Sequence, residues 1–237
     1  MPNHNKFSDK LIVALDFPNI KAAQNLVENL GDSVTFYKIG LELLMGGQYF
    51  EMINWLEKRN KKVFADLKLY DISATVGKAI KNLSAYNNIE FLTIHTASCG
   101  IMEQAAANKG NIKLLGVTVL TNLDNADLLD MGFDPDISLP DLVIKKAQLA
   151  QKCGIDGVVC SGLEATNIRG NLGADFTIVS PGIRLQQEAQ IKQDDQKRVV
   201  DVKTALQNGV NHIVVGRPIN AAADPKEAAQ RFLQFLH

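Results

Sequence analysis

The chain has 237 residues, of which 46% are hydrophobic and 22% are charged, and its formal net charge is −1. This composition suits a globular protein with a large core. The near-zero charge gives no reason to expect nucleic acid as a partner, and no apolar run approaches the roughly 18 residues of a membrane helix. The three cysteines form no CxxC pair, so we expect a reduced, cytoplasmic protein without a disulfide framework or zinc knot.

Short apolar runs rich in β-branched residues recur along the chain, and each is followed by a stretch with helical periodicity. Because these runs are nearly continuous in apolar residues, they predict parallel strands that are buried on both faces. The predicted strands are Leu11–Leu15, Thr35–Ile39, Lys62–Leu67, Phe91–Ile94, Lys113–Val119, Gly157–Val159, Phe176–Val179 and His212–Val215.

The stretches between these strands place apolar residues at helical spacing. The last of them has the clearest start signal, because Asp224 suits the N-cap, Pro225 the first helical position and Glu227 the third. Gly31 and Gly209 are typical helix stops. The predicted helices include Ile20–Leu30, Tyr49–Lys58, Thr75–Leu83, Met102–Asn108, Leu142–Cys153 and Lys226–Leu236.

Eight strand–helix units in this length predict a (β/α)8 TIM barrel. With no linker composition in the chain, we expect residues 1–237 to form one barrel domain. A doubly wound open sheet is the main alternative, but its glycine-rich dinucleotide turn is absent after the first strand, where Asp16-Phe17-Pro18-Asn19 stands. The long polar connections Thr121–Pro140 and Ile183–Lys197 are candidate lids or ligand-binding loops.

The segment from Asp66 to Asp71 carries the most functional information. Asp66 and Lys68 stand at positions i and i+2 at a predicted strand end, so they share one face, and Asp71 falls in the following turn. In a parallel barrel, side chains at the C-terminal strand ends line the active site. An acid beside an ammonium there suggests proton transfer near a developing carbanion, whereas a solvated surface pair is the alternative for this segment alone.

Lys38 lies inside the apolar run of the second predicted strand. A lysine in a buried strand is costly unless it is paired, and Asp66 on the neighbouring strand is its expected partner. A lysine that extends its ammonium to the strand edge is the alternative. Asp16 ends the first strand, where it either joins this charged group or caps the following helix.

Two glycine–arginine turns follow the last two predicted strands. Pro181, Gly182 and Arg184 stand in one of them, and Gly216 and Arg217 in the other. Barrels frequently bind phosphate at this place, because backbone N–H groups and a helix N-terminus face the anion there and arginine adds a bidentate contact. The two turns together predict a phosphorylated substrate.

Eight segments in chain order resemble the orotidine 5'-phosphate decarboxylase family. This resemblance implies a (β/α)8 barrel that acts as a homodimer, needs no metal or organic cofactor, and converts orotidine 5'-monophosphate to UMP and CO2. The segments are Ala14-Leu15-Asp16, Tyr37-Lys38-Ile39-Gly40, Asp66 to Ile72, Thr75-Val76, Gly116 to Thr121, Ser180 to Arg184, Asp195 to Arg198 and Val215 to Pro218.

The resemblance also implies roles for individual residues. Lys38, Asp66, Lys68 and Asp71 correspond to an alternating charge array in which Lys68 protonates C6 of the pyrimidine. Asp71 and Thr75 correspond to residues that act in the active site of the other subunit. The substrate contacts implied are Asp16 and Lys38 on the ribose hydroxyls, Thr121 on the pyrimidine, Arg217, Gln196 and the Gly216 backbone on the phosphate, and Pro181 and Arg184 beside them.

The segment from Arg184 to Gln196 departs from the family pattern. It is a few residues longer than usual and lacks the glycine common before the glutamine. Gln193 is therefore the alternative to Gln196 as the phosphate contact.

Three other functions compete with this interpretation. A 3-keto-L-gulonate 6-phosphate decarboxylase is a similar barrel with its own D-x-K-x-x-D, but it resembles a magnesium enzyme with a glutamate where Lys38 stands, and a charged lysine cannot ligate Mg²⁺. A phosphosugar isomerase or epimerase needs acid–base pairs on opposite faces of the substrate, which the pattern does not show. A catalytically silent phosphate-binding barrel has no need to bury four charges.

Overall fold

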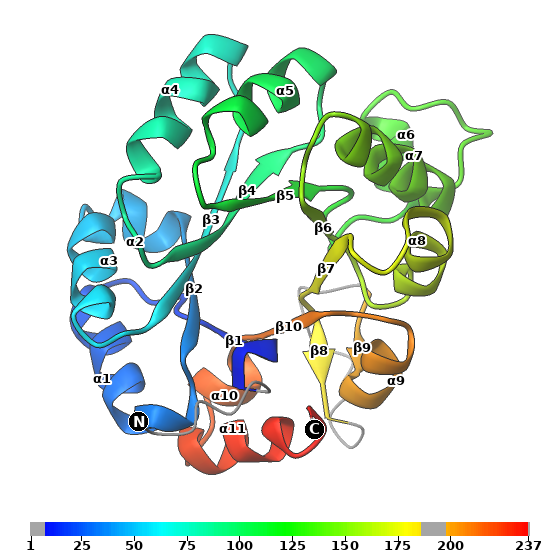
Figure 1. Ribbon diagram of the computed structural model, residues 1–237. Coiled ribbons are helices and arrows are strands. Elements are labelled where there is room, and N and C mark those ends of the chain that lie inside the picture. The colour runs from blue at the N-terminus through cyan, green and yellow to red at the C-terminus, as the bar shows by residue number, and fades with distance from the viewer. Residues whose placement is uncertain (1–7, 186–197, 237) are drawn as a thin grey trace.

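The computed structural model describes residues 8–185 and 198–236 and contains a closed barrel of eight parallel strands (Figure 1). The barrel closes because β1 pairs with both β2 and β10, with Leu11 opposite Ile213. This closure confirms the predicted (β/α)8 barrel and excludes the open sheet. In barrel order the strands are β1 (Leu11–Ala14), β10 (His212–Val215), β7 (Thr177–Ser180), β6 (Gly157–Val159), β5 (Lys113–Val117), β4 (Ile89–His95), β3 (Lys62–Leu69) and β2 (Phe36–Gly40).

Helices surround the barrel (Figure 1), and several of them begin at a residue whose side chain caps the first turn. Asp224 caps α11 as predicted, since its side chain accepts the N–H of Glu227. Asn19, and not Asp16, caps α1, and Gly31 ends it with φ 55°. The helices are α1 (Ile20–Leu30), α2 (Leu41–Met45), α3 (Tyr49–Glu57), α4 (Ser73–Leu83), α5 (Cys99–Asn108), α6 (Asn125–Asp130), α7 (Leu139–Lys152), α8 (Ala165–Leu172), α9 (Val202–Gln207), α10 (Arg217–Asn220) and α11 (Pro225–Leu233).

The two predicted long connections contain structure that the sequence pattern does not reveal. Thr121–Pro140 includes α6, which a capping box between Asp124 and Asp127 begins. In the connection after β7, β8 (Ile183–Arg184) pairs with β9 (Val200–Asp201) in a separate two-stranded sheet. Among the described residues, no helix has the length and apolar character needed to cross a membrane.

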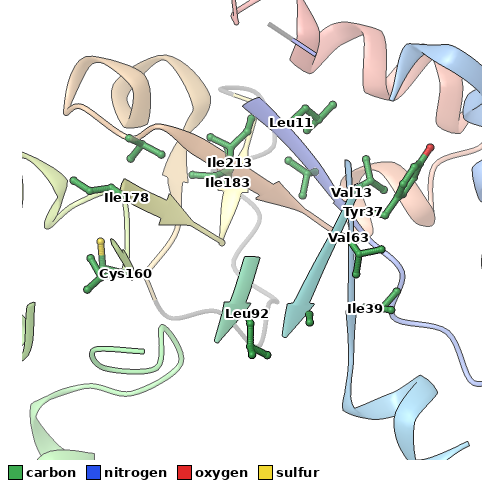
Figure 2. Packing of buried hydrophobic residues seen from close by; sticks show 14 of the residues in the cluster. Leu11, Val13, Tyr37, Ile39, Val63, Leu92, Cys160, Ile178, Ile183 and Ile213 are labelled. Carbon is green, nitrogen blue, oxygen red and sulfur yellow. The ribbon is translucent and has the colours of Figure 1, made fainter. Parts of the chain in front are cut away.

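Alternate residues of each barrel strand face the helices and the barrel interior, as the period of two requires. On β1, Leu11 and Val13 pack in the outer layer, whereas Ile12 and Ala14 belong to a separate inner cluster. That inner cluster is rich in phenylalanine: Phe91 lies 5.2 Å from Phe36 and 5.9 Å from Phe64 between ring centroids. Figure 2 shows members of the outer layer, including Leu11, Val13, Tyr37, Ile39, Val63, Leu92, Ile178 and Ile213.

Gly157 on β6 offers a test of this packing, because a Cβ there would lie 2.2 Å from the carbonyl oxygen of Thr177 on β7. The clash is with backbone, so no rotamer change relieves it. We expect Gly157→Ala to lower the free energy of unfolding by about 1–3 kcal/mol. Urea denaturation measures the change.

Gly170→Ala is the matched control. Gly170 lies in α8, and an added Cβ meets no atom within 4 Å there. We expect this change to raise the free energy of unfolding by about 0.5–1 kcal/mol, because alanine favours helix. Equal effects of the two alanines would contradict the close approach of β6 and β7.

Candidate active site

A cavity of about 590 Å³ opens at the C-terminal ends of the barrel strands. It brings together nine of the predicted site residues, although they come from strands far apart in the sequence. The nine that line the cavity are Asp16, Lys38, Asp66, Lys68, Thr121, Pro181, Arg184, Gly216 and Arg217.

Four charged side chains form a continuous chain along one wall of the cavity. Lys38 Nζ lies 2.8 Å from Asp16 Oδ1 and 3.5 Å from Asp66 Oδ2, and Lys68 Nζ lies 2.8 Å from Asp66 Oδ1. The expected pairing of Lys38 with Asp66 is therefore confirmed, and Asp16 joins the charged group. Only 12% of the Lys38 and 14% of the Asp66 side chain is exposed, against 30% for Lys68. Lys68 is thus the ammonium most open to a bound molecule.

The ion pairs keep the two buried members charged. Burial opposes the charge on Lys38, but Asp66 and Asp16 outweigh it and raise the pKa of the ammonium above its ordinary 10.5. Burial likewise opposes ionisation of Asp66, but Lys38 and Lys68 hold the pKa of its carboxyl below the ordinary 3.8. The stabilisation from Asp66 is lost only as pH falls through its lowered pKa, and that from Lys38 only as pH rises through its raised pKa. Both charges therefore persist across neutral pH.

A bulge in β3 gives Lys68 its direction. Ala65 pairs with Leu92 and Leu69 with Ile94, so the three residues from 66 to 68 face the single residue Thr93 on β4. Lys68 adopts a left-handed conformation with φ 47°, which is uncommon for a residue with a side chain. Bulges often redirect side chains beside active sites.

Thr93 holds this bulge together and is a residue that the sequence pattern did not single out. Its hydroxyl accepts the N–H of Lys68 at 2.9 Å and donates to Asp66 Oδ1 at 3.0 Å. Thr93 itself is fully buried, so its hydroxyl is shielded from water. One side chain therefore fixes both the backbone of the lysine and the carboxylate that pairs with it.

The floor of the cavity is apolar. Phe64, Val117, Val159 and Val214 line it, and the strand period places Asp66 two residues beyond Phe64 on the same face. Charges above such a floor lie in a medium of lower dielectric than water, which strengthens their interactions. None of these apolar residues was identified as a site residue from the sequence, because they resemble ordinary strand core.

The opposite rim of the cavity has the features of an anion site. Gly182 has φ 73°, a conformation that favours glycine. Gly216 immediately precedes α10, whose first residue is Arg217. Arg184 also lines the cavity, so two guanidinium groups and a glycine-flanked backbone face the same space.

Among the described residues, two predicted site residues, Asp71 and Thr75, do not line this cavity. Asp71 and Thr75 are exposed, and the Asp71 carboxylate accepts the N–H of Ile72 at 2.6 Å. Gln196 and its alternative Gln193 lie outside the described residues.

Residues 9–232 match the model of the "Orotidine 5'-phosphate decarboxylase / HUMPS family". The chain belongs to this family. The match spans both the charged wall and the anion rim of the cavity.

Relatives within the decarboxylase family cover almost the entire chain. The orotidine 5'-phosphate decarboxylase of Methylococcus capsulatus is 51% identical over 94% of this chain and 90% of its own length. That of Stenotrophomonas maltophilia is 48% identical over 95% of this chain and 92% of its own. The crystal structure of the Lactobacillus acidophilus enzyme superposes with a TM-score of 0.82 at 33% identity, covering 96% of this chain and 98% of the other.

In this decarboxylase-family barrel a buried ion pair connects the loops around the cavity. The Arg198 guanidinium binds the Glu164 carboxylate, and its Nη2 donates to the carbonyl oxygens of Val119 and Leu120, both at 3.0 Å. Its backbone N–H donates to Thr121 O at 3.3 Å. Arg198 therefore fixes the loop that carries Thr121 next to the residues that begin β9.

The sequence pattern did not identify Glu164 as the partner of Arg198, because the two residues lie 34 positions apart in the chain. Its other carboxylate oxygen accepts the N–H of Ser161 at 2.7 Å. Burial raises the pKa of Glu164, and Arg198 opposes that rise. The pair is enclosed, with 7% of the Glu164 and 11% of the Arg198 side chain exposed.

Removing one member of this pair tests its contribution. We expect Arg198→Met to lower the free energy of unfolding at pH 8 by about 3–5 kcal/mol, because it leaves a buried carboxylate without a partner. The loss should shrink towards pH 4, since the folded variant then takes up a proton on Glu164 that the unfolded chain binds less tightly. Urea denaturation at several pH values measures this dependence.

Two further variants control the experiment. Arg198→Met combined with Glu164→Leu removes both charges and should cost less than Arg198→Met alone. Glu28→Gln breaks the exposed pair with Arg59, whose atoms lie 3.7 Å apart, and should change stability by less than about 1 kcal/mol. A loss in Arg198→Met that is independent of pH would contradict the proposed ionisation of Glu164.

Proposed function

We propose that this protein decarboxylates orotidine 5'-monophosphate to UMP. The observation that carries the proposal is the chain of alternating charges from Asp16 through Lys38 and Asp66 to Lys68, placed over an apolar floor and opposite an anion-binding rim. Family membership and the activity for which the relatives are named support the same function.

Lys68 carries the chemical step in this proposal. The C6 carboxylate leaves as CO2, its bonding electrons stay on C6, and C6 then takes a proton from the Lys68 ammonium. The carbanion has no π-system over which to delocalise, so a fixed positive charge must lie where the negative charge develops. At about 4 Å and an effective dielectric near 20, one such charge pair contributes roughly 4 kcal/mol. Lys68 then acts as the general acid.

Asp66 has two effects. It holds the Lys68 ammonium in place through the 2.8 Å contact. Its carboxylate also repels the substrate carboxylate, and this repulsion disappears as neutral CO2 departs. The lowered pKa of Asp66 supports this role, because Lys38 and Lys68 outweigh burial and favour the ionised carboxylate.

The remaining cavity residues bind the parts of the substrate that do not react. We assign the ribose hydroxyls to Asp16 and Lys38 and the pyrimidine to Thr121. The phosphate is assigned to Arg217, the Gly216 backbone and Gln196, with Arg184 and Pro181 beside them. Binding energy from the distant phosphate then helps to position the pyrimidine over Lys68.

Lys38 argues against a metal-dependent phosphosugar decarboxylase. Its ammonium occupies the space between the carboxylates of Asp16 and Asp66. Those carboxylates are therefore already neutralised by a cation that cannot itself ligate Mg²⁺. The side chains present therefore favour a reaction in which a lysine ammonium, and not a metal ion, supplies the positive charge.

Asp71 and Thr75 are proposed to act across a homodimer interface. Both follow the C-terminal end of β3 and do not line the cavity. Asp71 stands between two exposed apolar residues, Tyr70 at 69% and Ile72 at 71% exposure. Exposed apolar residues that form a contiguous patch mark protein interfaces, and Tyr70 and Ile72 supply two such residues on either side of Asp71. A partner subunit packed on them would bring its own Asp71 towards the neighbouring Lys68.

Replacing Lys68 tests the reaction. We expect Lys68→Ala to slow decarboxylation roughly 10³-fold or more, because it removes both the fixed charge and the proton donor. The ultraviolet absorbance of orotidine 5'-monophosphate follows turnover, with and without EDTA. The exposed lysine of α11 gives the control Lys226→Ala, which should keep full activity.

Normal turnover by folded Lys68→Ala would refute the role of Lys68. Loss of wild-type turnover on adding EDTA would refute the metal-free mechanism. Absence of turnover by the folded wild-type protein would refute the proposed substrate.

Mixing two inactive variants tests the shared site. A heterodimer of Lys68→Ala and Asp71→Ala chains contains one site with both native residues if Asp71 acts across the interface. A 1:1 mixture after subunit exchange should therefore recover about a quarter of wild-type activity, since half of the dimers are mixed and each has one native site. No recovery despite subunit exchange shown by mass spectrometry would contradict the assignment.

A further inference from the structure

We propose that Cys99 and Cys153 form a redox-active dithiol that closes into an intramolecular disulfide between α5 and α7. The fold brings them together although 54 residues separate them, and the Cys153 thiol donates to Cys99 Sγ at 2.9 Å. This contact lies outside the proposed catalytic cavity, whose lining includes neither residue.

The two cysteines differ in how a reagent reaches them. Cys99 is the first residue of α5 and is partly exposed, whereas Cys153 ends α7 and is 4% exposed. An oxidant in solution therefore meets Cys99 first, and Cys153 lies directly behind it. The third cysteine, Cys160, is also buried and is no part of this contact.

The chemistry balances with a small disulfide such as oxidised glutathione as the oxidant. The Cys99 thiolate attacks one glutathione sulfur, which forms a mixed disulfide and releases one glutathione thiolate. The Cys153 thiolate then attacks Cys99 Sγ and expels the second glutathione. Two protein thiols lose two electrons and two protons, and the oxidant is reduced to two glutathione thiols.

The surroundings of the pair favour a disulfide that is hard to reduce. Burial, the contact with Cys99 and the nearby Glu103 carboxylate together raise the pKa of Cys153 to about 11. Strongly oxidising protein disulfides owe their potential to a stabilised reduced form. The Cys153 thiolate lacks such stabilisation, so the free energy of the reduced pair is not lowered relative to that of the disulfide.

The test oxidises the reduced full-length protein with oxidised glutathione in the presence of EDTA, which keeps metal ions away from the thiols. We expect two of the three thiols to be lost and the intact mass to fall by about 2 Da. Tryptic mapping should then show Cys99 linked to Cys153. Dithiothreitol should restore all three thiols.

Three single variants make the result specific. Cys153→Ser should stop at a glutathione adduct on Cys99, and Cys99→Ser should keep its Cys153 thiol. Cys160→Ser should still lose two thiols. Survival of three thiols in the wild type, a stable glutathione adduct in the wild type, or a link that includes Cys160 would each overturn the proposal.

Discussion

The carboxylate of Asp66, held between two lysine ammoniums, is the interaction on which the rest of the site depends. A buried charge is costly unless every partner is in place, and here Lys38, Lys68 and the Thr93 hydroxyl all reach the same group. The partners come from three adjacent strands, so only a closed and well-packed barrel keeps them at these distances. The phenylalanine-rich interior supplies that rigidity and excludes water beneath the charges.

The bulge in β3 places Lys68 within reach of the Asp66 carboxylate. A left-handed backbone at a lysine costs of the order of 1–3 kcal/mol and persists only where the surroundings enforce it. Thr93 supplies that enforcement, because its hydroxyl satisfies the backbone N–H of Lys68 that the bulge leaves without a strand partner. The strain is therefore located at Lys68, the residue proposed to deliver the proton. The packing of the surrounding strands compensates for its free-energy cost.

The same barrel connects the two ends of the proposed substrate. The anion rim lies after β7 and β10, whereas Thr121 follows β5. Arg198 contacts three consecutive residues from Val119 to Thr121 and is itself held by Glu164. Arg198 therefore ties the loop assigned to the pyrimidine to the start of β9, which pairs with β8 beside the anion rim.

The sequence by itself determined the eight barrel strands, the capping of α11 and the residues of the charged wall, because apolar periodicity and local capping are short-range properties of the chain. It also placed Asp66 and Lys68 on one face, although it assumed a regular strand where the structure has a bulge. Tertiary structure alone decided that Asp16 pairs with Lys38, that Thr93 supports Lys68, that Glu164 meets Arg198, and that Cys99 touches Cys153. Each of these contacts joins residues at least 22 positions apart, and their distance in space is fixed by barrel closure and helix packing, which no local pattern encodes.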